Sequence, residues 1–271
     1  MFKSVLVPVD GSSHSWSALQ QAIWIAKRED ASIRLVHVVD IRLIVPSAEG
    51  GMPNFSYQQQ LVDYLEEAGK QILEEAKGRC DAEDIPCKTA LITGTTANVI
   101  CEQAHMVDLI AMGHRGAGES WAGLMLGSTF ENVVRQANKP VLACPRAPRL
   151  IRKLLVAYDG SRMANDALFV AAHMATDWRL PMVLLTVADG DAHADAVLEE
   201  GKAYLASYDL DIKPVLAQGH PAEEILRVSV DEDCDLTIMG AYGHGRFLKI
   251  LFGTTVDEVM RKSRCPVLIC R

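Results

Sequence analysis

The sequence predicts two consecutive α/β domains of the same design, each a parallel β-sheet covered by helices on both faces. The chain has 271 residues, which is longer than one ordinary domain of about 150 residues. KSVLVPVDGS at 3–12 recurs as KLLVAYDGS at 153–161, which indicates an internal repeat. In both copies, apolar runs typical of buried parallel strands alternate with segments of helical periodicity.

The repeat continues through the chain in the same order. Ala18-Leu19 correspond to Ala167-Leu168 at an offset of 149, and LGSTFENVV at 126–134 corresponds to FGTTVDEVM at 252–260 at an offset of 126. The second copy therefore lacks about 22 residues, which match a loop of the first copy, VPSAEGGMPNFSYQ. Because prolines in RAPRL and just before it interrupt regular structure, we predict domains at 1–147 and 148–271.

The elements of the first copy follow from its apolar pattern. SVLVPV at 4–9 predicts a buried strand, and apolar residues at helical spacing from Trp16 to Ala26 predict a helix that Ser12 or Ser13 caps. The same reasoning predicts a strand at 33–39, a helix at 61–76, a strand at 87–93, a helix at 99–104, a strand at 108–113, a helix at 128–138 and a strand at 140–144. The second copy follows this plan, with Pro221 in the first turn of its third helix.

The composition excludes some classes of binding partner and predicts where in the cell the protein is found. The formal net charge of −8 argues against a broad surface for nucleic acid or anionic membranes. The N-terminus lacks the features of a secretory signal, and no apolar run approaches 18 residues, so we expect a cytoplasmic protein without membrane insertion. Seven scattered cysteines without a C-x-x-C pair indicate reduced core thiols, and no metal site is predicted.

Candidate binding residues follow the first and fourth strands of each copy. In open parallel sheets, ligands bind at the carboxyl ends of strands where the winding direction reverses. Asp-Gly-Ser follows the first strand at 10–12 and at 159–161, and glycine-rich loops follow the fourth strand at 113–118 and 240–246. Each loop is followed by Gly-Ser or Gly-Thr at a helix start, the outline of a phosphate site. The alternative is a flexible loop with an ordinary helix cap.

These residues resemble the universal stress proteins, specifically those with two such domains in one chain. The family's nucleotide motif G-x2-G-x9-G-[ST] is matched by GAYGHGRFLKILFGT at 240–254. The first copy departs from it, because ten residues separate Gly116 from Gly127. The resemblance covers nearly the whole chain. It implies a Rossmann-like fold of the adenine nucleotide alpha hydrolase type, with five parallel strands in the order 3-2-1-4-5 in each domain.

The resemblance also implies the ligand and the residues that hold it. The ligand would be ATP, or else AMP or ADP, with Mg²⁺ carried by the phosphates. In the second copy the implied nucleotide site consists of Ala157, Tyr158, Asp159, Val187, Gly240, Gly243, His244, Gly245, Arg246, Gly253, Thr254 and Thr255. A second, looser site in the first copy consists of Pro8, Val9, Asp10, Val38, Gly113, Gly116, Gly127, Ser128 and Thr129.

We therefore expect a stress-response regulatory module that binds an adenine nucleotide mainly in the C-terminal domain. No catalytic residue is assigned, because no general base or arginine finger is found beside the loop, so hydrolysis is expected to be slow at most. Pairing of the two domains through their fifth strands and a homodimer are implied by the family. Two alternatives stay open: a nucleotide-free module for an apolar or lipid-like ligand, and an enzyme that uses an adenylyl group.

Overall fold

The computed structural model describes residues 1–40, 42, 55–116, 126–190, 193–241 and 254–271. The N-terminal half consists of β1 (Ser4–Pro8), α1 (Ser13–Glu29), β2 (Ser32–Asp40), α2 (Phe55–Asp81), β3 (Cys87–Gly94), α3 (Thr96–Ala104), β4 (Leu109–Gly113), α4 (Ser128–Gln136) and β5 (Val141–Cys144). The C-terminal half consists of β6 (Leu154–Ala157), α5 (Arg162–Trp178), β7 (Met182–Ala188), α6 (Ala194–Leu205), β8 (Ile212–Gln218), α7 (Pro221–Asp231), β9 (Leu236–Gly240), α8 (Thr254–Lys262) and β10 (Val267–Cys270). The predicted succession of strands and helices is confirmed.

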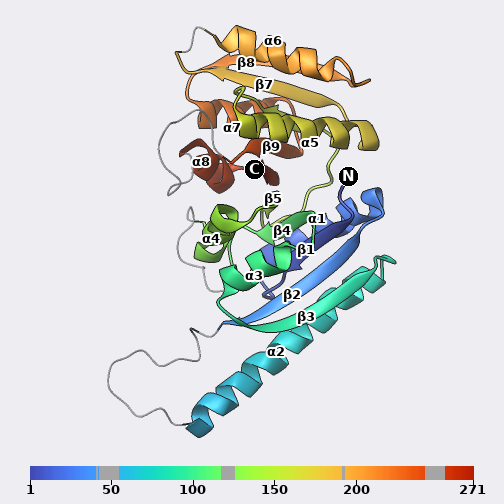
Figure 1. Cartoon of the computed structure of the whole chain (residues 1–271), viewed down its shortest axis with the longest axis vertical. Helices are drawn as coiled ribbons and strands as arrows, with labels where there is room; N and C mark the ends of the chain where they lie inside the picture. Colours follow the sequence, from blue (N-terminus) through green and yellow to red (C-terminus); the bar gives the residue numbers. More distant parts are fainter. Residues whose placement is uncertain (41, 43–54, 117–125, 191–192, 242–253) are drawn as a thin grey trace.

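The ten strands form one sheet in the order β3-β2-β1-β4-β5-β10-β9-β6-β7-β8, which runs through both halves (Figure 1). Within each half the strands are parallel and have the predicted order 3-2-1-4-5. The halves join through β5 and β10, which pair antiparallel with Leu142 opposite Leu268. These two leucines occupy equivalent positions in the repeat, so an approximate two-fold axis relates the halves at this point. The fifth strands therefore pair within one chain.

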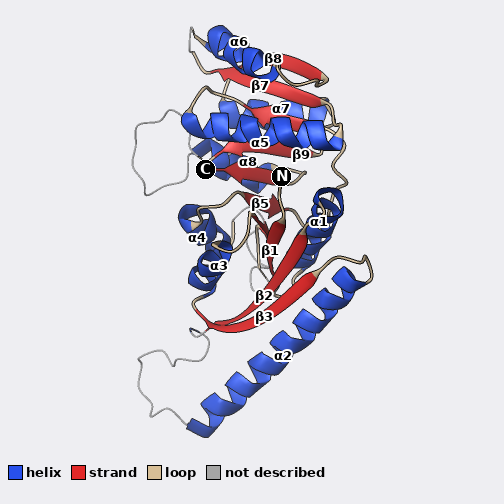
Figure 2. Ribbon diagram, turned by 45° about the vertical axis from the view of Figure 1, so that its right-hand side comes forward, coloured by secondary structure: helices blue, strands red, loops and turns tan. Residues whose placement is uncertain are grey.

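Helices cover both faces of the sheet (Figure 2). One face carries α1, α2, α5 and α6, whose apolar side chains share a core that extends through both halves. The opposite face carries α3, α4, α7 and α8 over a second core of the same extent. Because the central strands are buried on both sides, their side chains are mostly apolar without alternation, as in the fully buried β1 triplet Val5, Leu6 and Val7.

The two halves differ most in the second helix. We expected the extra length of the first copy to be loop, but α2 has 27 residues and α6 has 12. The tract expected to be loop ends inside α2, which already begins at Phe55. The expectation was wrong there because the glycines and prolines that indicate a loop all lie before Phe55, whereas the residues after it have helical periodicity.

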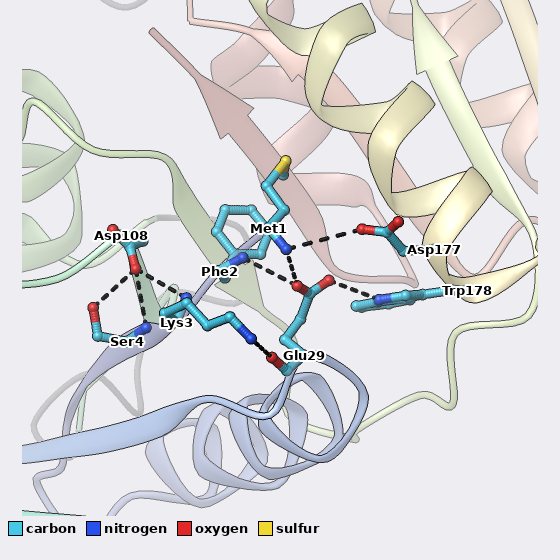
Figure 3. A network of polar contacts seen from close by, with 8 residues as sticks. All are labelled: Met1, Phe2, Lys3, Ser4, Glu29, Asp108, Asp177 and Trp178. Atoms are coloured by element: carbon cyan, nitrogen blue, oxygen red, sulfur yellow. Dashed lines mark hydrogen bonds and ion pairs between the residues drawn. The ribbon is translucent and has the colours of Figure 1, made fainter. Parts of the chain in front are cut away.

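The ends of α1 and α5 meet where the halves contact each other (Figure 3). The buried Glu29 carboxylate accepts hydrogen bonds from the Phe2 amide at 3.1 Å and from Trp178 Nε1 at 2.8 Å, and it pairs with the Met1 amino group. Arg28 lies over the Trp178 ring at 5.2 Å from its centroid. Glu29 and Trp178 are 149 residues apart, the offset of the repeat, so each contacts its own counterpart.

Candidate functional site

The turn after the first strand has the same geometry in both halves. Gly11 and Gly160 have φ values of +79° and +74°, which only glycine adopts readily. The aspartate before each glycine accepts a hydrogen bond from the backbone N–H two residues later, at 3.0 Å in both cases. The serines that donate these bonds, Ser12 and Ser161, then cap α1 and α5 through their side chains. Asp10 and Asp159 are thus held at the carboxyl end of the sheet.

The glycine that ends the fourth strand allows the helix after the first strand to approach closely. A Cβ at Gly113 would lie 2.6 Å from His14 Cβ and 2.9 Å from the His14 carbonyl carbon. A Cβ at Gly240 would lie 2.7 Å from the Met163 carbonyl carbon and 2.8 Å from the Ala164 nitrogen. Contacts this short leave no room for a side chain, so both glycines are required by helix packing, whatever else they do.

The sequence-predicted residues of the N-terminal half surround a cavity of about 120 Å³. It lies where β1 and β4 end, the point at which the winding direction of the sheet reverses. The predicted residues that line it are Pro8, Val9, Asp10, Val38, Gly113, Gly116, Gly127 and Thr129. Ser128 does not line the cavity and is exposed at the first position of α4. The structure therefore brings eight of the nine residues together.

Gly116 closes one side of this cavity against the first-strand aspartate. A Cβ at Gly116 would lie 3.1 Å from Asp10 Oδ2, so the loop backbone passes directly over the carboxylate. The Gly127 amide donates a 2.9 Å hydrogen bond to the His114 carbonyl, which ties the start of α4 to the same loop. The α4 N-terminus, which is the positive end of the helix dipole, therefore borders the cavity.

Sequence reasoning missed the apolar walls of the cavity. Ile100, Met112 and Phe130 line it together with Val36. Each also belongs to the core on the α3 and α4 face, so its helical or strand periodicity indicated core packing alone. Thr96 and Arg115 were missed as well, and they add a hydroxyl and a cation to the polar rim. The position of Arg115 between two loop glycines was the one available signal.

Two histidines beside the cavity are constrained by their contacts. His37 Nδ1 lies 2.8 Å from the Val9 carbonyl oxygen, so this nitrogen carries the proton and donates. His114 is 8% exposed and contacts the His14 ring edge-on at 5.0 Å. Burial, reinforced by His14 and Arg115, lowers the pKa of His114 to about 4. His114 is therefore neutral at pH 7, and the cationic side chain at the cavity is Arg115.

In the C-terminal half, five predicted residues lie outside the described residues: Gly243, His244, Gly245, Arg246 and Gly253. The rest occupy positions equivalent to their N-terminal counterparts. Asp159 follows the end of β6 by two residues, Val187 lies near the end of β7, Gly240 ends β9, and Thr254 and Thr255 begin α8. Ala157 packs at the end of β6 on the α7 and α8 face.

The Tyr158 ring points to the face opposite Ala157. It packs in the core beneath α6, where a Cβ at Gly201 would lie 3.0 Å from Tyr158 Cδ1. Its hydroxyl donates to Asn165 Oδ1 at 2.8 Å, and burial raises its pKa to about 12. Only the main chain of Tyr158 reaches the carboxyl edge of the sheet, through bonds to Leu185 and Thr186.

The arrangement in the N-terminal half suits a ligand with three parts. The apolar walls would hold a flat or aliphatic group, Asp10 would accept hydrogen bonds from hydroxyl groups, and the α4 N-terminus with Arg115 would attract an anion. Among the described residues, no cluster of three His, Cys, Asp or Glu side chains is arranged to hold a metal ion. None of the described helices is both long and apolar enough to cross a membrane.

An open α/β sheet with a glycine-lined cavity at its reversal point defines a protein of the doubly wound α/β class, in which this point is where ligands bind. The family model of the universal stress protein family matches residues 1–145 and 190–271. The chain belongs to the universal stress protein family.

Among similar proteins, some match nearly the whole chain and others about half of it. Universal stress protein Slr1230 of Synechocystis is 28% identical over 99% of this chain and 100% of its own length. Universal stress protein MJ0531 of Methanocaldococcus jannaschii is 33% identical over 52% of this chain and 81% of its own length. A crystal structure of a universal stress protein from Archaeoglobus fulgidus covers 99% of this chain and 96% of its own, with a TM-score of 0.80 and 23% identity, which supports the fold.

Proposed function

We propose that this protein is a regulatory module that binds an adenine nucleotide, ATP in the first instance, at the carboxyl ends of the first and fourth strands. The observation that carries the proposal is the N-terminal cavity, where Asp10, Gly116 and Gly127 meet beside an apolar wall. A purine ring would pack against Met112 and Ile100, and the ribose hydroxyls would bond to Asp10. The phosphates, with Mg²⁺ bound to them, would lie at the α4 N-terminus.

We infer that the C-terminal half holds the phosphates more tightly. Its loop matches the family motif spacing from Gly240 to Thr254, whereas the N-terminal loop has one more residue between Gly116 and Gly127. The described framework supports an equivalent cleft there, because Asp159 has the same turn as Asp10 and α8 begins where α4 does. Backbone amides bind phosphate only when the loop places them together, so one inserted residue weakens that grip.

A pair of charge-adding variants tests both sites. Gly116→Asp would place a carboxylate against Asp10, and Gly243→Asp would place one in the C-terminal loop; Gly78→Asp is the matched control, because nothing lies within 4 Å of a Cβ at Gly78. ATP and AMP binding to the full chain would be measured by titration calorimetry with and without Mg²⁺. We expect Gly243→Asp to weaken ATP binding at least about tenfold, a cost of about 1.4 kcal/mol, through repulsion of the phosphates.

The other results have definite meanings. Gly116→Asp should weaken only the lower-affinity binding, and Gly78→Asp should leave both affinities unchanged. A tenfold loss in Gly116→Asp alone would reverse the assignment of the two copies. An absence of ATP and AMP binding in the wild-type chain, with no nucleotide released from the purified protein on denaturation, would contradict the proposal.

One observation favours a second candidate for the N-terminal half. Ile100, Met112, Phe130 and three valines make its cavity largely apolar, and Asp10 and Arg115 lie at the rim. A small amphipathic ligand such as a fatty acid would place its chain against this wall and its carboxylate at Arg115. Thermal unfolding of Gly243→Asp with added fatty acid or ATP separates the two, because only the true ligand raises the melting temperature.

A further inference from the structure

Two cysteine side chains meet at the outer edge of the N-terminal half. Cys80 lies in the last turn of α2 and Cys87 is the first residue of β3, which is an edge strand of the sheet. The chain turns back between them, and the Ile85 amide donates a 3.0 Å hydrogen bond to the Cys80 carbonyl. All seven cysteines of the chain are free thiols, and the Cys87 side chain packs against the core cluster that contains the buried Cys80 side chain.

The two thiols have different environments. Cys80 is fully buried, whereas Cys87 is half-buried on the edge strand. The hydrogen bond with Cys80 is the largest influence on the pKa of Cys87 and lowers it; burial and the Asp81 carboxylate oppose this shift, and the Lys77 ammonium supports it. The same hydrogen bond, together with burial, raises the pKa of Cys80. Cys87 is therefore the sulfur that ionises and meets solvent, and Cys80 is the protonated thiol behind it.

The C-terminal half shows that packing does not require sulfur here. Cys87 pairs with Ile33 in the sheet, and in the C-terminal half Ile212 pairs with the equivalent residue, Met182. Leu205 stands seven residues before Ile212, as Cys80 stands before Cys87, and both Leu205 and Cys80 are fully buried. The same contact between helix end and strand start is thus made by two aliphatic side chains in one half and by two thiols in the other.

We propose that Cys80 and Cys87 form a reversible dithiol–disulfide site that reacts with peroxides. The Cys87 sulfur attacks a peroxide oxygen, the O–O bond breaks, and the leaving oxygen takes a proton and departs as water, which leaves a sulfenic acid. The Cys80 sulfur then attacks the Cys87 sulfur, an S–S bond forms, and the hydroxyl group leaves with the Cys80 proton as a second water. Two thiols are oxidised by two electrons and one hydrogen peroxide is reduced.

Peptide mapping by mass spectrometry detects the disulfide product of this reaction directly. Trypsin releases both cysteines in one peptide, CDAEDIPCK at 80–88, because it cleaves after Arg79 and Lys88. The full chain is treated with hydrogen peroxide, denatured and alkylated. We expect this peptide to lose two hydrogens and to carry no alkyl group, and to regain two alkyl groups after reduction with dithiothreitol. Recovery of the doubly alkylated peptide after peroxide would overturn the proposal.

Variants and a second cysteine supply the controls. Cys101 is also half-buried, but burial raises its pKa, so native alkylation with iodoacetamide at pH 7 should modify Cys87 before Cys101. Cys80→Ser should leave Cys87 to accumulate as sulfinic acid, since no second thiol can resolve it. Cys80→Leu with Cys87→Ile copies the C-terminal contact and should fold with no peroxide response. Equal alkylation of Cys87 and Cys101, or an unoxidised Cys87 in Cys80→Ser, would count against the site.

Discussion

At the end of its first strand the N-terminal half has Val9, whose carbonyl accepts a hydrogen bond from the His37 ring, whereas the C-terminal half has Tyr158, whose carbonyl accepts one from the Thr186 hydroxyl. The two bonds are 2.8 and 2.9 Å long and join equivalent positions of the repeat. The backbone of the cleft is therefore the same, although every side chain in this contact differs. The two copies share the residues that determine the backbone conformation, whereas the side chains that pack around it differ.

The second helix of each half, α2 or α6, explains why these packing side chains differ. In the N-terminal half the His37 ring lies beneath α2, where a Cβ at Gly69 would come within 2.6 Å of its Cδ2. In the C-terminal half the ring beneath the shorter α6 is Tyr158, packed against Gly201. An aromatic ring fills this layer in both halves, but it comes from different strands. Substitutions at equivalent positions of the two halves therefore test which contacts the halves share and which have diverged.

The largest effect on the free energy of unfolding is expected at the contact between Glu29 and Trp178. Trp178→Ala should lower the free energy of unfolding by about 3–5 kcal/mol, because a buried ring is lost and the Glu29 carboxylate loses a donor. Trp178→Phe should cost less, because most of the ring remains. Urea unfolding of both variants provides the measurement. A loss below about 1 kcal/mol in Trp178→Ala would mean that the contact does not hold the halves together.

The two helix-packing glycines should behave alike. Gly113→Ala and Gly240→Ala each force a Cβ against main-chain and Cβ atoms at 2.6–2.9 Å, so each should destabilise by about 1–3 kcal/mol or more. Gly78→Ala is the control, because its Cβ meets nothing within 4 Å and alanine favours a helix. Melting curves of the three variants test this. If one of the two glycines tolerated alanine, the close contact between the fourth strand and the helix after the first strand would differ between the two halves.

His114 should make the N-terminal half sensitive to acid. Its counterpart in the repeat is Ala241, and its folded pKa of about 4 lies below the ordinary value of 6.5. Because only the unfolded state binds the proton between these values, stability is complete above pH 6.5 and is lost as the pH falls toward 4. The loss between pH 7 and pH 5 is about 2 kcal/mol. In urea titrations at both pH values, His114→Ala should remove that part of the pH dependence, whatever it does to stability at pH 7.

The smallest effect is expected at the helix caps. Ser12→Ala and Ser161→Ala each remove a side-chain acceptor for an amide at the start of α1 or α5, and each should cost about 1 kcal/mol. Ser13→Ala is the control, because Ser13 is exposed and the cap is Ser12. Thermal unfolding compares the three. Unequal losses of stability in Ser12→Ala and Ser161→Ala would show that the two caps, although alike in geometry, contribute differently to the free energy of unfolding.

Much of this structure could be predicted from the sequence because the repeat fixes many positions at once. The succession of strands and helices and a capping serine, Ser12 or Ser13, follow from patterns that glycine, aspartate and serine make visible. The strand order 3-2-1-4-5, which brings the first and fourth strands together, comes from the resemblance to the universal stress proteins. The walls of the N-terminal cavity could not be predicted in this way. Ile100, Met112 and Phe130 have the spacing of core residues, and the same side chains serve both core and cavity. The direction of the Tyr158 ring depends on Gly201 in a distant helix.

Leu142 faces Leu268, and Glu29 faces Trp178, so at both places a residue meets its own repeat counterpart. In an assembly of two identical subunits, a residue on the axis must be compatible with itself. Two glutamates would repel each other there, and two tryptophans would bring two donors and no acceptor. Fusion into one chain lifts that requirement, and the leucine pair has kept its symmetry while the pair at 29 and 178 has not. The two halves are therefore no longer interchangeable. The repeat now consists of two complementary parts rather than two equivalent copies.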